Sequence, residues 1–379
     1  MAIYLDNAAT TALDPEVLEA MLPLMKEHFG NPSSIHAMGR KTRTAIENSR
    51  KTIAKLINAE PGEIFFTSGG TEADNTAING CVYDLGITHA ITSKIEHHAV
   101  LHTLENLEKK GLIKLSIVNT TDNGLIDLKH LEELLANNPR SLVSLMHANN
   151  EIGNLLPIDE VGELCSKYNA IFHSDTVQTM GHYTHDVKST KIQFLVGAAH
   201  KFHGPKGIGF LYINHQLKIS PFIHGGSQER NMRGGTENVY GIVGLAKALE
   251  IAYRDIDAHQ NHVQSVKNYM IERLQQTIPG VEFNGTATTP EKSLYTVLNV
   301  LFPTTPNAEM LLFNLDIAGI FVSAGSACTS GSNQGSHVLR GIGTNMERPS
   351  IRFSFSRYST IAEIDAVVEK LAQMFLVVA

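Results

Sequence analysis

Short apolar runs alternate with amphipathic stretches over the first two thirds of the chain. Runs with apolar centres predict strands at 63–68, 89–94, 112–118, 141–147, 170–175, 194–199 and 207–213. Between these runs, apolar residues recur at helical spacing and predict helices at 71–85, 98–110, 128–137 and 158–168. This order predicts an α/β fold in which a mostly parallel seven-stranded sheet lies between helices on both faces. Ligands of such sheets bind outside the carboxyl ends of the strands.

The pattern changes in the last third of the chain. A long helical region is expected from about residue 239 to 277, and Pro279 and Gly280 end it. Strands are then expected at 281–285, 294–302, 321–326 and 350–356, and helices at 307–319 and 361–378. We therefore expect a large domain at 15–262 and a smaller α/β domain formed by 1–14 and 263–379, with Asp14 and Pro15 starting a helix between them.

The composition of the chain argues against several classes of protein. With 379 residues, 42% of them hydrophobic, the chain can build two domains with substantial cores. A net charge of −7 without a basic stripe argues against nucleic acid, and no apolar run is long enough for a membrane span or a signal peptide. Three widely separated cysteines (Cys81, Cys165 and Cys328) argue against a disulfide framework. We expect a cytoplasmic protein.

The most informative chemistry follows two of the predicted strands. The segment SDTVQ places Asp175 at the end of one strand, and AAHKFHGPKGIG places Lys201 in a loop of small residues after the next. A pyridoxal phosphate (PLP) enzyme needs a lysine that forms a Schiff base with the cofactor aldehyde, and an acid that keeps the pyridine nitrogen protonated. Taken alone, the same letters also fit a strand, a surface lysine and a turn.

Other polar residues fall at the same predicted edge of the sheet. In TSGGTEADN, glycines precede a helix that begins near Thr71, whose N-terminus and hydroxyl could bind the cofactor phosphate. His97 could stack on the pyridine ring, and Asn150 and Gln178 could donate to the ring hydroxyl. Each has an ordinary alternative, namely a glycine-rich turn, a polar surface histidine or a turn asparagine.

The remaining histidines and cysteines separate into two groups. His182 and His185 have the spacing of one helical turn, but nothing else supports a metal site, so we expect them to be solvated. Cys81 and Cys165 lie among apolar residues of helical patterns and are expected to be buried and inert.

Cys328 has different surroundings. It lies in SAGSACTSGSNQGSH, a run of small and polar residues that favours an exposed loop, where a thiol suits a nucleophile that travels between a buried site and a partner. Shortly after it, Arg352 lies among apolar residues of a predicted strand and needs a carboxylate partner. That partner could be the α-carboxylate of a substrate or an acid of the chain itself.

Taken together, these segments resemble a known family. The motifs that carry the resemblance are YLDNAATT, FGNPSSIHAMGR, TSGGTEADN, EHHAVL, MHANNEIGNLLPI, HSDTVQ, AHKFHGPKGIG, MRGGTENV, SAGSACTSGS and IRFSFSRY, which span the chain from end to end. The chain is similar to cysteine desulfurases of the class V, fold-type I PLP-dependent aminotransferase superfamily, of the type with the long SGSACTS loop.

The resemblance implies a cofactor site. It makes Lys201 the Schiff-base lysine, Asp175 the partner of the pyridinium and His97 the residue that stacks on the ring and moves a proton. Asn150 and Gln178 would face the ring hydroxyl. The residues that would surround the phosphate are Gly70, Thr71, Ala198 and His200, together with Thr236 from the partner subunit of a homodimer. Family members often have serine where this chain has Ala198, so one phosphate donor is expected to be missing.

The resemblance also implies the reaction. Lys201 would remove the Cα proton of L-cysteine, whose carboxylate Arg352 and Asn150 would bind, and Cys328 would attack the substrate sulfur to give L-alanine and a persulfide. The sulfur would pass to an acceptor such as an iron–sulfur scaffold. No metal is expected, although Cys328 could ligate an iron–sulfur cluster transiently. Selenocysteine lyases, other β-lyases and class V aminotransferases share the cofactor residues, so these activities stay open alternatives.

Overall fold

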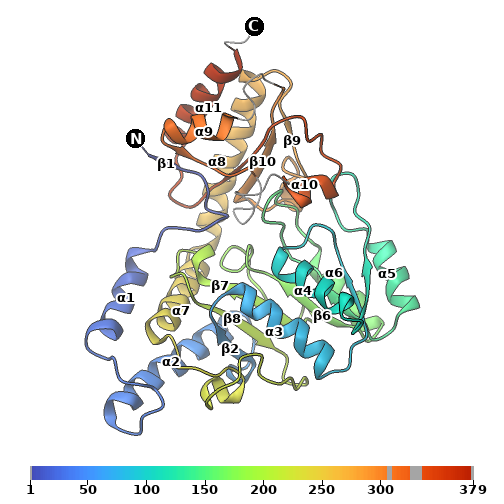
Figure 1. The fold of residues 1–379 in the computed structure, drawn as a ribbon. Coiled ribbons are helices and arrows are strands. Elements are labelled where there is room, and N and C mark those ends of the chain that lie inside the picture. The colour runs from blue at the N-terminus through green and yellow to red at the C-terminus, as the bar shows by residue number, and fades with distance from the viewer. Residues whose placement is uncertain (1, 305–309, 325–334, 377–379) are drawn as a thin grey trace.

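The computed structural model describes residues 2–304, 310–324 and 335–376, and a large seven-stranded sheet forms its centre (Figure 1). The strands are β2 (Ile64–Thr67), β3 (His89–Thr92), β4 (Lys114–Ile117), β5 (Leu142–Ser144), β6 (Ile171–Asp175), β7 (Phe194–Ala198) and β8 (Gly209–Ile213). They lie in the order β2-β8-β7-β6-β5-β3-β4, and β8 alone runs antiparallel to both of its neighbours. The predicted α/β fold and all seven of its strands are confirmed.

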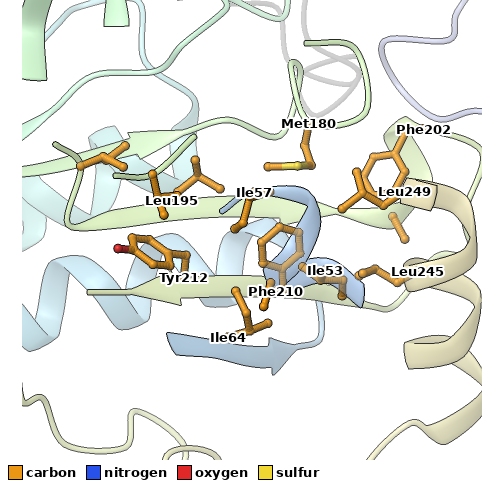
Figure 2. Close-up of a cluster of buried hydrophobic side chains, with 14 of the residues drawn as sticks. Ile53, Ile57, Ile64, Met180, Leu195, Phe202, Phe210, Tyr212, Leu245 and Leu249 are labelled. Atoms are coloured by element: carbon orange, nitrogen blue, oxygen red, sulfur yellow. The ribbon is translucent and has the colours of Figure 1, made fainter. Parts of the chain in front are cut away.

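Helices cover both faces of this sheet. On one face lie α1 (Pro15–Lys26), α2 (Ala37–Leu56), α5 (Leu128–Asn137), α6 (Ile158–Lys167) and α7 (Val239–Arg254), and on the other lie α3 (Gly70–Tyr83) and α4 (His98–Lys109). The first core lies between the sheet and α1, α2, α5, α6 and α7, and the second lies between the sheet and α3 and α4. Side chains of a strand alternate between the two faces of the sheet, so Leu195 of β7 packs in the first core, whereas Phe194 and Val196 pack in the second. Figure 2 shows the first core, where side chains of α2 and α7 meet those of β7 and β8.

The long helical region near residue 239 is two helices rather than one. Helix α7 ends at Arg254, and α8 (Ile256–Thr277) starts after Asp255, whose φ and ψ of −114° and 19° interrupt the helix. The carboxylate of Asp255 accepts a hydrogen bond from the Arg254 guanidinium at 2.7 Å. This local interaction involves neither glycine nor proline, so the sequence pattern did not mark the break.

The C-terminal part of the chain has its own sheets and core. Antiparallel strands β9 (Glu282–Phe283), β10 (Val297–Leu301) and β12 (Ser350–Ser354) form one sheet, and β1 (Ile3–Tyr4) pairs in parallel with β11 (Ile320–Phe321). Helices α8, α9 (Leu311–Ile317), α10 (His337–Gly341) and α11 (Ile361–Leu376) accompany them. Short 3₁₀ turns complete the elements: η1 (Pro61–Glu63), η2 (Ala199–Lys201), η3 (Gln228–Asn231) and η4 (Pro290–Lys292).

The N-terminal segment connects the two parts. After β1, residues 5–13 run back towards the large sheet, and Asp14 caps α1 as predicted, its carboxylate accepting from Glu16 N at 2.7 Å.

None of the helices in the described part of the chain is long and apolar enough to cross a membrane.

Candidate active site

A cavity of about 230 Å³ opens at the carboxyl ends of the central strands. Its lining comes from the N-terminal segment, from loops of the large sheet and from β12. The lining residues are Ala8, Ala9, Gly70, Thr71, Asp74, His97, Met146, Asn150, Asp175, Val177, Gln178, Ala198, His200, Lys201 and Arg352. Ten of the predicted site residues therefore meet at one place, although they are spread over more than 280 positions of the sequence.

Lys201 reaches this cavity from η2, directly after β7. Its ammonium group donates to the carbonyl oxygens of Ala8 at 2.5 Å and Ala9 at 3.0 Å. Its own carbonyl lies 3.2 Å from Nε2 of His182. The backbone carbonyls of the N-terminal segment thus orient the ammonium group, the His182 side chain contacts the lysine backbone, and the N-terminal segment supplies part of the site.

Asp175 lies at the end of β6, with two further buried acids nearby. Its carboxylate accepts from Val177 N at 2.9 Å. Burial raises the pKa of Glu96 to about 8 and that of Asp74 well above its usual range, and the charge of Asp175 adds to both shifts. Glu96 is therefore largely neutral near pH 7, and burial disfavours the charged form of Asp74 in the same direction, which reduces the negative charge buried beside Asp175.

The sequence analysis assigned no role to Asp74 or Glu96. Asp74 lies 3.3 Å from Nε2 of His173, a buried histidine whose pKa burial lowers to about 3. The carboxyl of Glu96 accepts from Ser93 Oγ and from Met146 N. An acid in the first turns of a helix, as Asp74 is in α3, or just before a helix, as Glu96 is before α4, is normally solvated, so only the packing against the sheet reveals that these two are buried.

His97 is the N-cap of α4, not a loose residue at a strand end. Its Nδ1 accepts from Ala99 N at 3.2 Å, so the proton of the neutral ring lies on Nε2. Burial lowers the pKa of His97; the carboxylate of Asp175 opposes this shift and the charge of Lys201 adds to it. A neutral imidazole at the edge of the cavity results.

The N-terminus of α3 forms another wall of the cavity. A Cβ at Gly70 would approach Val177 Cγ2 to 2.7 Å, so this position requires glycine. Thr71 follows it in the first turn, where unpaired backbone N–H groups favour an anion. His200 contacts Thr10 Oγ1 through Nδ1 at 3.2 Å, and Ala198 is buried at the strand end.

Thr236 does not reach this cavity within one chain. It lines a separate pocket with Ser68, Glu229 and Arg233. The segment that leads to it is anchored by a buried ion pair, in which Arg50 binds both carboxylate oxygens of Glu229 at 2.8 and 2.9 Å. Three consecutive residues of η3, 229–231, have positive φ angles of 46°, 58° and 66°, and this anchor holds them there.

Arg352 has the partner that its burial requires. Only 1% exposed, it donates to Asp6 Oδ1 and to the carbonyl of Asn150, each at 2.8 Å. Its Nε has no hydrogen-bond partner among the described residues. The interpretation as an ion pair within the chain is therefore confirmed, and the binding of a substrate carboxylate by Arg352 stays a prediction. Gln178 donates to the carbonyl of Ala8 at 3.0 Å.

The three cysteines differ in what the structure shows of them. Cys328 lies outside the described residues. Cys81 and Cys165 are buried free thiols as predicted, and burial raises both pKa values, that of Cys165 to about 12.

The prediction for His182 and His185 was wrong. His185 is buried, His182 also bonds the hydroxyl of Tyr295, and burial lowers both pKa values to about 4. Neither histidine lies on a helix, because His182 is in a turn and His185 is in an irregular segment, so their spacing carried no information. No group of three or more metal-ligating side chains gathers within the described ranges.

The donor set of the cavity fits PLP. Lys201 offers an amine, Asp175 a carboxylate for the pyridine nitrogen, His97 a neutral ring, and the N-terminus of α3 an anion site. Because Gly70 has no side chain, it presents backbone to the cavity that it lines. The roles of the single residues stay predictions.

Comparison with known proteins gives consistent matches over nearly the whole chain. The family model described as "Aminotransferase class-V" matches residues 3–367. A relative from Dictyoglomus turgidum (strain DSM 6724 / Z-1310), "Cysteine desulfurase IscS", is 44% identical over 376 residues, covering 98% of this chain and 94% of the relative. The solved "NIFS-LIKE PROTEIN" is similar with a TM-score of 0.91 at 36% identity over 100% of both chains. "SspA in complex with cysteine" gives 0.82 at 32% identity, over 94% of this chain and 100% of the other.

Proposed function

The chain belongs to the class V aminotransferase family and is a PLP-dependent cysteine desulfurase, and on this premise we propose that Cys328 accepts the sulfur of L-cysteine as a persulfide. One observation carries the proposal. Ser323 forms backbone hydrogen bonds with Arg352, a wall of the cavity, and Cys328 follows only five residues later. Five extended residues reach up to about 17 Å, so the thiol can enter the cavity.

Each cavity residue has a role in this proposal. Asp175 would hold the pyridine nitrogen protonated, His97 would stack on the ring, and Asn150 and Gln178 would bind the ring hydroxyl. The phosphate contacts are Gly70, Thr71, Ala198 and His200. When bound, the cofactor acts as an electron sink that makes the Cα proton of the substrate acidic and the Cβ–S bond weak.

The proton and sulfur steps follow from the positions of the side chains. Arg352 and Asn150 bind the substrate carboxylate, which directs the Cα proton towards the amine of Lys201. The thiolate of Cys328 attacks the substrate sulfur: an S–S bond forms, the Cβ–S bond breaks, and its electron pair stays on Cβ, which takes up a proton to become the methyl group of alanine. His97, neutral with its proton on Nε2, is the residue that moves a proton during these steps.

We further propose a homodimer with shared sites, in which Thr236 reaches the cofactor phosphate of the partner subunit. Support comes from the large apolar side chains that one chain leaves exposed around this segment and around α1 and α2. They include Ile35 at 91%, Phe29 at 76%, Phe222 at 45% and Tyr240 at 44%. A second copy of the chain would bury them.

We also propose the domain boundaries, the type of sulfur acceptor and the cellular location of the enzyme. Residues 15–262 would form the large domain, and 1–14 with 263–379 the small one, which is supported by the separate cores and by the pairing of β1 with β11. The sulfur acceptor would be a protein such as an iron–sulfur scaffold. A cytoplasmic location is supported by the free thiols of Cys81 and Cys165.

Replacing Cys328 by serine tests the central claim. The variant should keep bound PLP and a spectral change on adding L-cysteine, while sulfide release with a reductant falls by about a thousandfold or more, because a serine hydroxyl is a far weaker nucleophile. Cys81→Ser and Cys165→Ser are the matched controls and should retain activity. Mass spectrometry of the wild type after L-cysteine should find one added sulfur on the peptide of Cys328. Sulfur on another cysteine, or full activity in Cys328→Ser, would refute the assignment.

A further inference from the structure

Two acceptors fix the guanidinium of Arg352 from different directions. One Nη donates to Asp6 Oδ1 and the other to the carbonyl oxygen of Asn150, both at 2.8 Å. The Nε–H has no partner within the described ranges and is buried. A guanidinium presents its donors in one rigid plane, so fixing both Nη atoms also fixes the direction of Nε–H.

Asp6 Oδ1 also accepts a second hydrogen bond, from the hydroxyl of Ser323 at 2.8 Å. The backbones of Ser323 and Arg352 are themselves bonded, Arg352 N to Ser323 O at 2.7 Å and Ser323 N to Arg352 O at 3.3 Å. Asp6 is held in turn by its bridge to Ser354 on β12. The carboxylate therefore cannot shift without disturbing both partners.

The second acceptor of Arg352, the carbonyl of Asn150, lies next to a residue that contacts the other side of position 328. Asn150 is followed by Glu151, a fully buried acid that accepts from the hydroxyl of Ser336 at 2.5 Å. Ser336 is the N-cap of α10, its hydroxyl accepting from Leu339 N. The described residues on both sides of position 328 are thus joined to the environment of Arg352, one through Asp6 and one through the residue after Asn150.

We propose that Asp6 is a positioning residue, which holds Arg352 for the substrate α-carboxylate and joins it to the strand end that precedes Cys328. This inference rests on the proposed carboxylate-binding role of Arg352. The Asp6 side chain is 18% exposed, and its pairing with the buried guanidinium offsets part of the cost of burying that charge. Asp6 and the carbonyl of Asn150 each accept from one Nη, so one N–H on each Nη remains for an oxygen of the substrate.

The test compares two ligands that differ in the carboxylate. In PLP-loaded Cys328→Ala protein, the Kd values of L-cysteine and of cysteamine, which lacks the carboxylate, are measured by absorbance titration. Asp6→Ala should raise the Kd of L-cysteine about tenfold and that of cysteamine less than about twofold, as expected when a charge-assisted contact is lost. Asp6→Asn keeps an acceptor oxygen and should fall in between. Glu282→Gln removes the carboxylate paired with Arg348 at the far side of the small sheet, and should change neither value.

Arg352→Gln separates this inference from its premise. If Arg352→Gln leaves the cysteine-to-cysteamine ratio unchanged, the carboxylate-binding role itself fails. If Arg352→Gln changes that ratio but Asp6→Ala does not, Arg352 keeps its role and the proposal for Asp6 is overturned. Should Asp6→Ala fail to fold, Asp6→Asn decides: a higher Kd for cysteine alone supports positioning, and equal changes for both ligands mean a general structural role.

Discussion

Replacing Glu229 by glutamine removes the negative charge of the buried ion pair between Arg50 and Glu229. The side chains of Arg50 and Glu229 are 2% and 3% exposed, and the carboxylate also accepts from Phe66 N at 2.9 Å. Burial alone would lower the pKa of Arg50, but its bonds to Glu229 outweigh this and raise it. Removing one partner leaves the guanidinium with the carbonyl of Ile64 and the half-exposed Glu47.

The expected cost follows from this geometry. Breaking a buried pair on one side destabilises by about 3–5 kcal/mol. At roughly 2 °C per kcal/mol for a domain of this size, the Tm should fall by about 6–10 °C. Calorimetry of the PLP-loaded protein near neutral pH measures it for Glu229→Gln, Arg50→Met and the double variant.

The double variant and a surface control complete this test. The double variant should recover at least half of the larger single loss, because it leaves no unpaired charge. Arg254→Met, which breaks exposed pairs with Glu16 and Asp255, should lower the Tm far less than either single variant of the buried pair. A loss below about 2 °C in both single variants, or a double variant less stable than either, would refute the reasoning.

Three further predictions follow from the same structure. Borohydride treatment of the PLP-loaded protein should attach a pyridoxyl group to Lys201, and modification of Lys206 instead would contradict the placement of η2. Mixing Lys201→Ala with Thr236→Ala subunits should restore activity through one intact site per hybrid dimer, and an inactive mixture with exchanged subunits would refute the shared site. Burial lowers the pKa of Lys267, which donates to Ser293 and Leu294, to about 7. Between about pH 7 and pH 10 the unfolded chain therefore binds one proton more than the folded chain, so the free energy of unfolding should rise by up to about 1.4 kcal/mol per pH unit. In Lys267→Met this rise should be absent. Comparing the Tm of the two proteins at about pH 7 and at about pH 10 tests this.

The elements of the large sheet were predictable because most of its strands are buried on both faces, the edge strand β4 being the exception. A run such as 194–199 is apolar at every position, and the turns that bound it contain small or polar residues. The loop residues Asp175 and Lys201 could be placed together for the same reason, since adjacent parallel strands end at one edge.

Contacts between distant segments could not be predicted. Nothing in YLDNAATT shows that the carbonyls of Ala8 and Ala9 accept from Lys201, or that Asp6 pairs with Arg352. The burial of Asp74 depends on how α3 packs, not on its own neighbours in sequence. Short β11 (Ile320–Phe321), expected to be longer, owes its existence to pairing with β1. Local patterns record which face of an element is apolar, but not what it meets.

The bond between Asp6 and Arg352 closes a loop of 346 residues. Contacts of such long sequence separation form late, because the entropy of closing the loop must be lost before they contribute. On the ribosome, the first ten residues emerge early but remain without their partners β11 and β12 until synthesis is nearly complete. The large sheet can fold in the meantime, yet the wall of the cavity that holds Lys201 is still missing. A nascent or C-terminally truncated chain would therefore be largely folded and catalytically silent, so that sulfur chemistry begins only when the whole chain has been made.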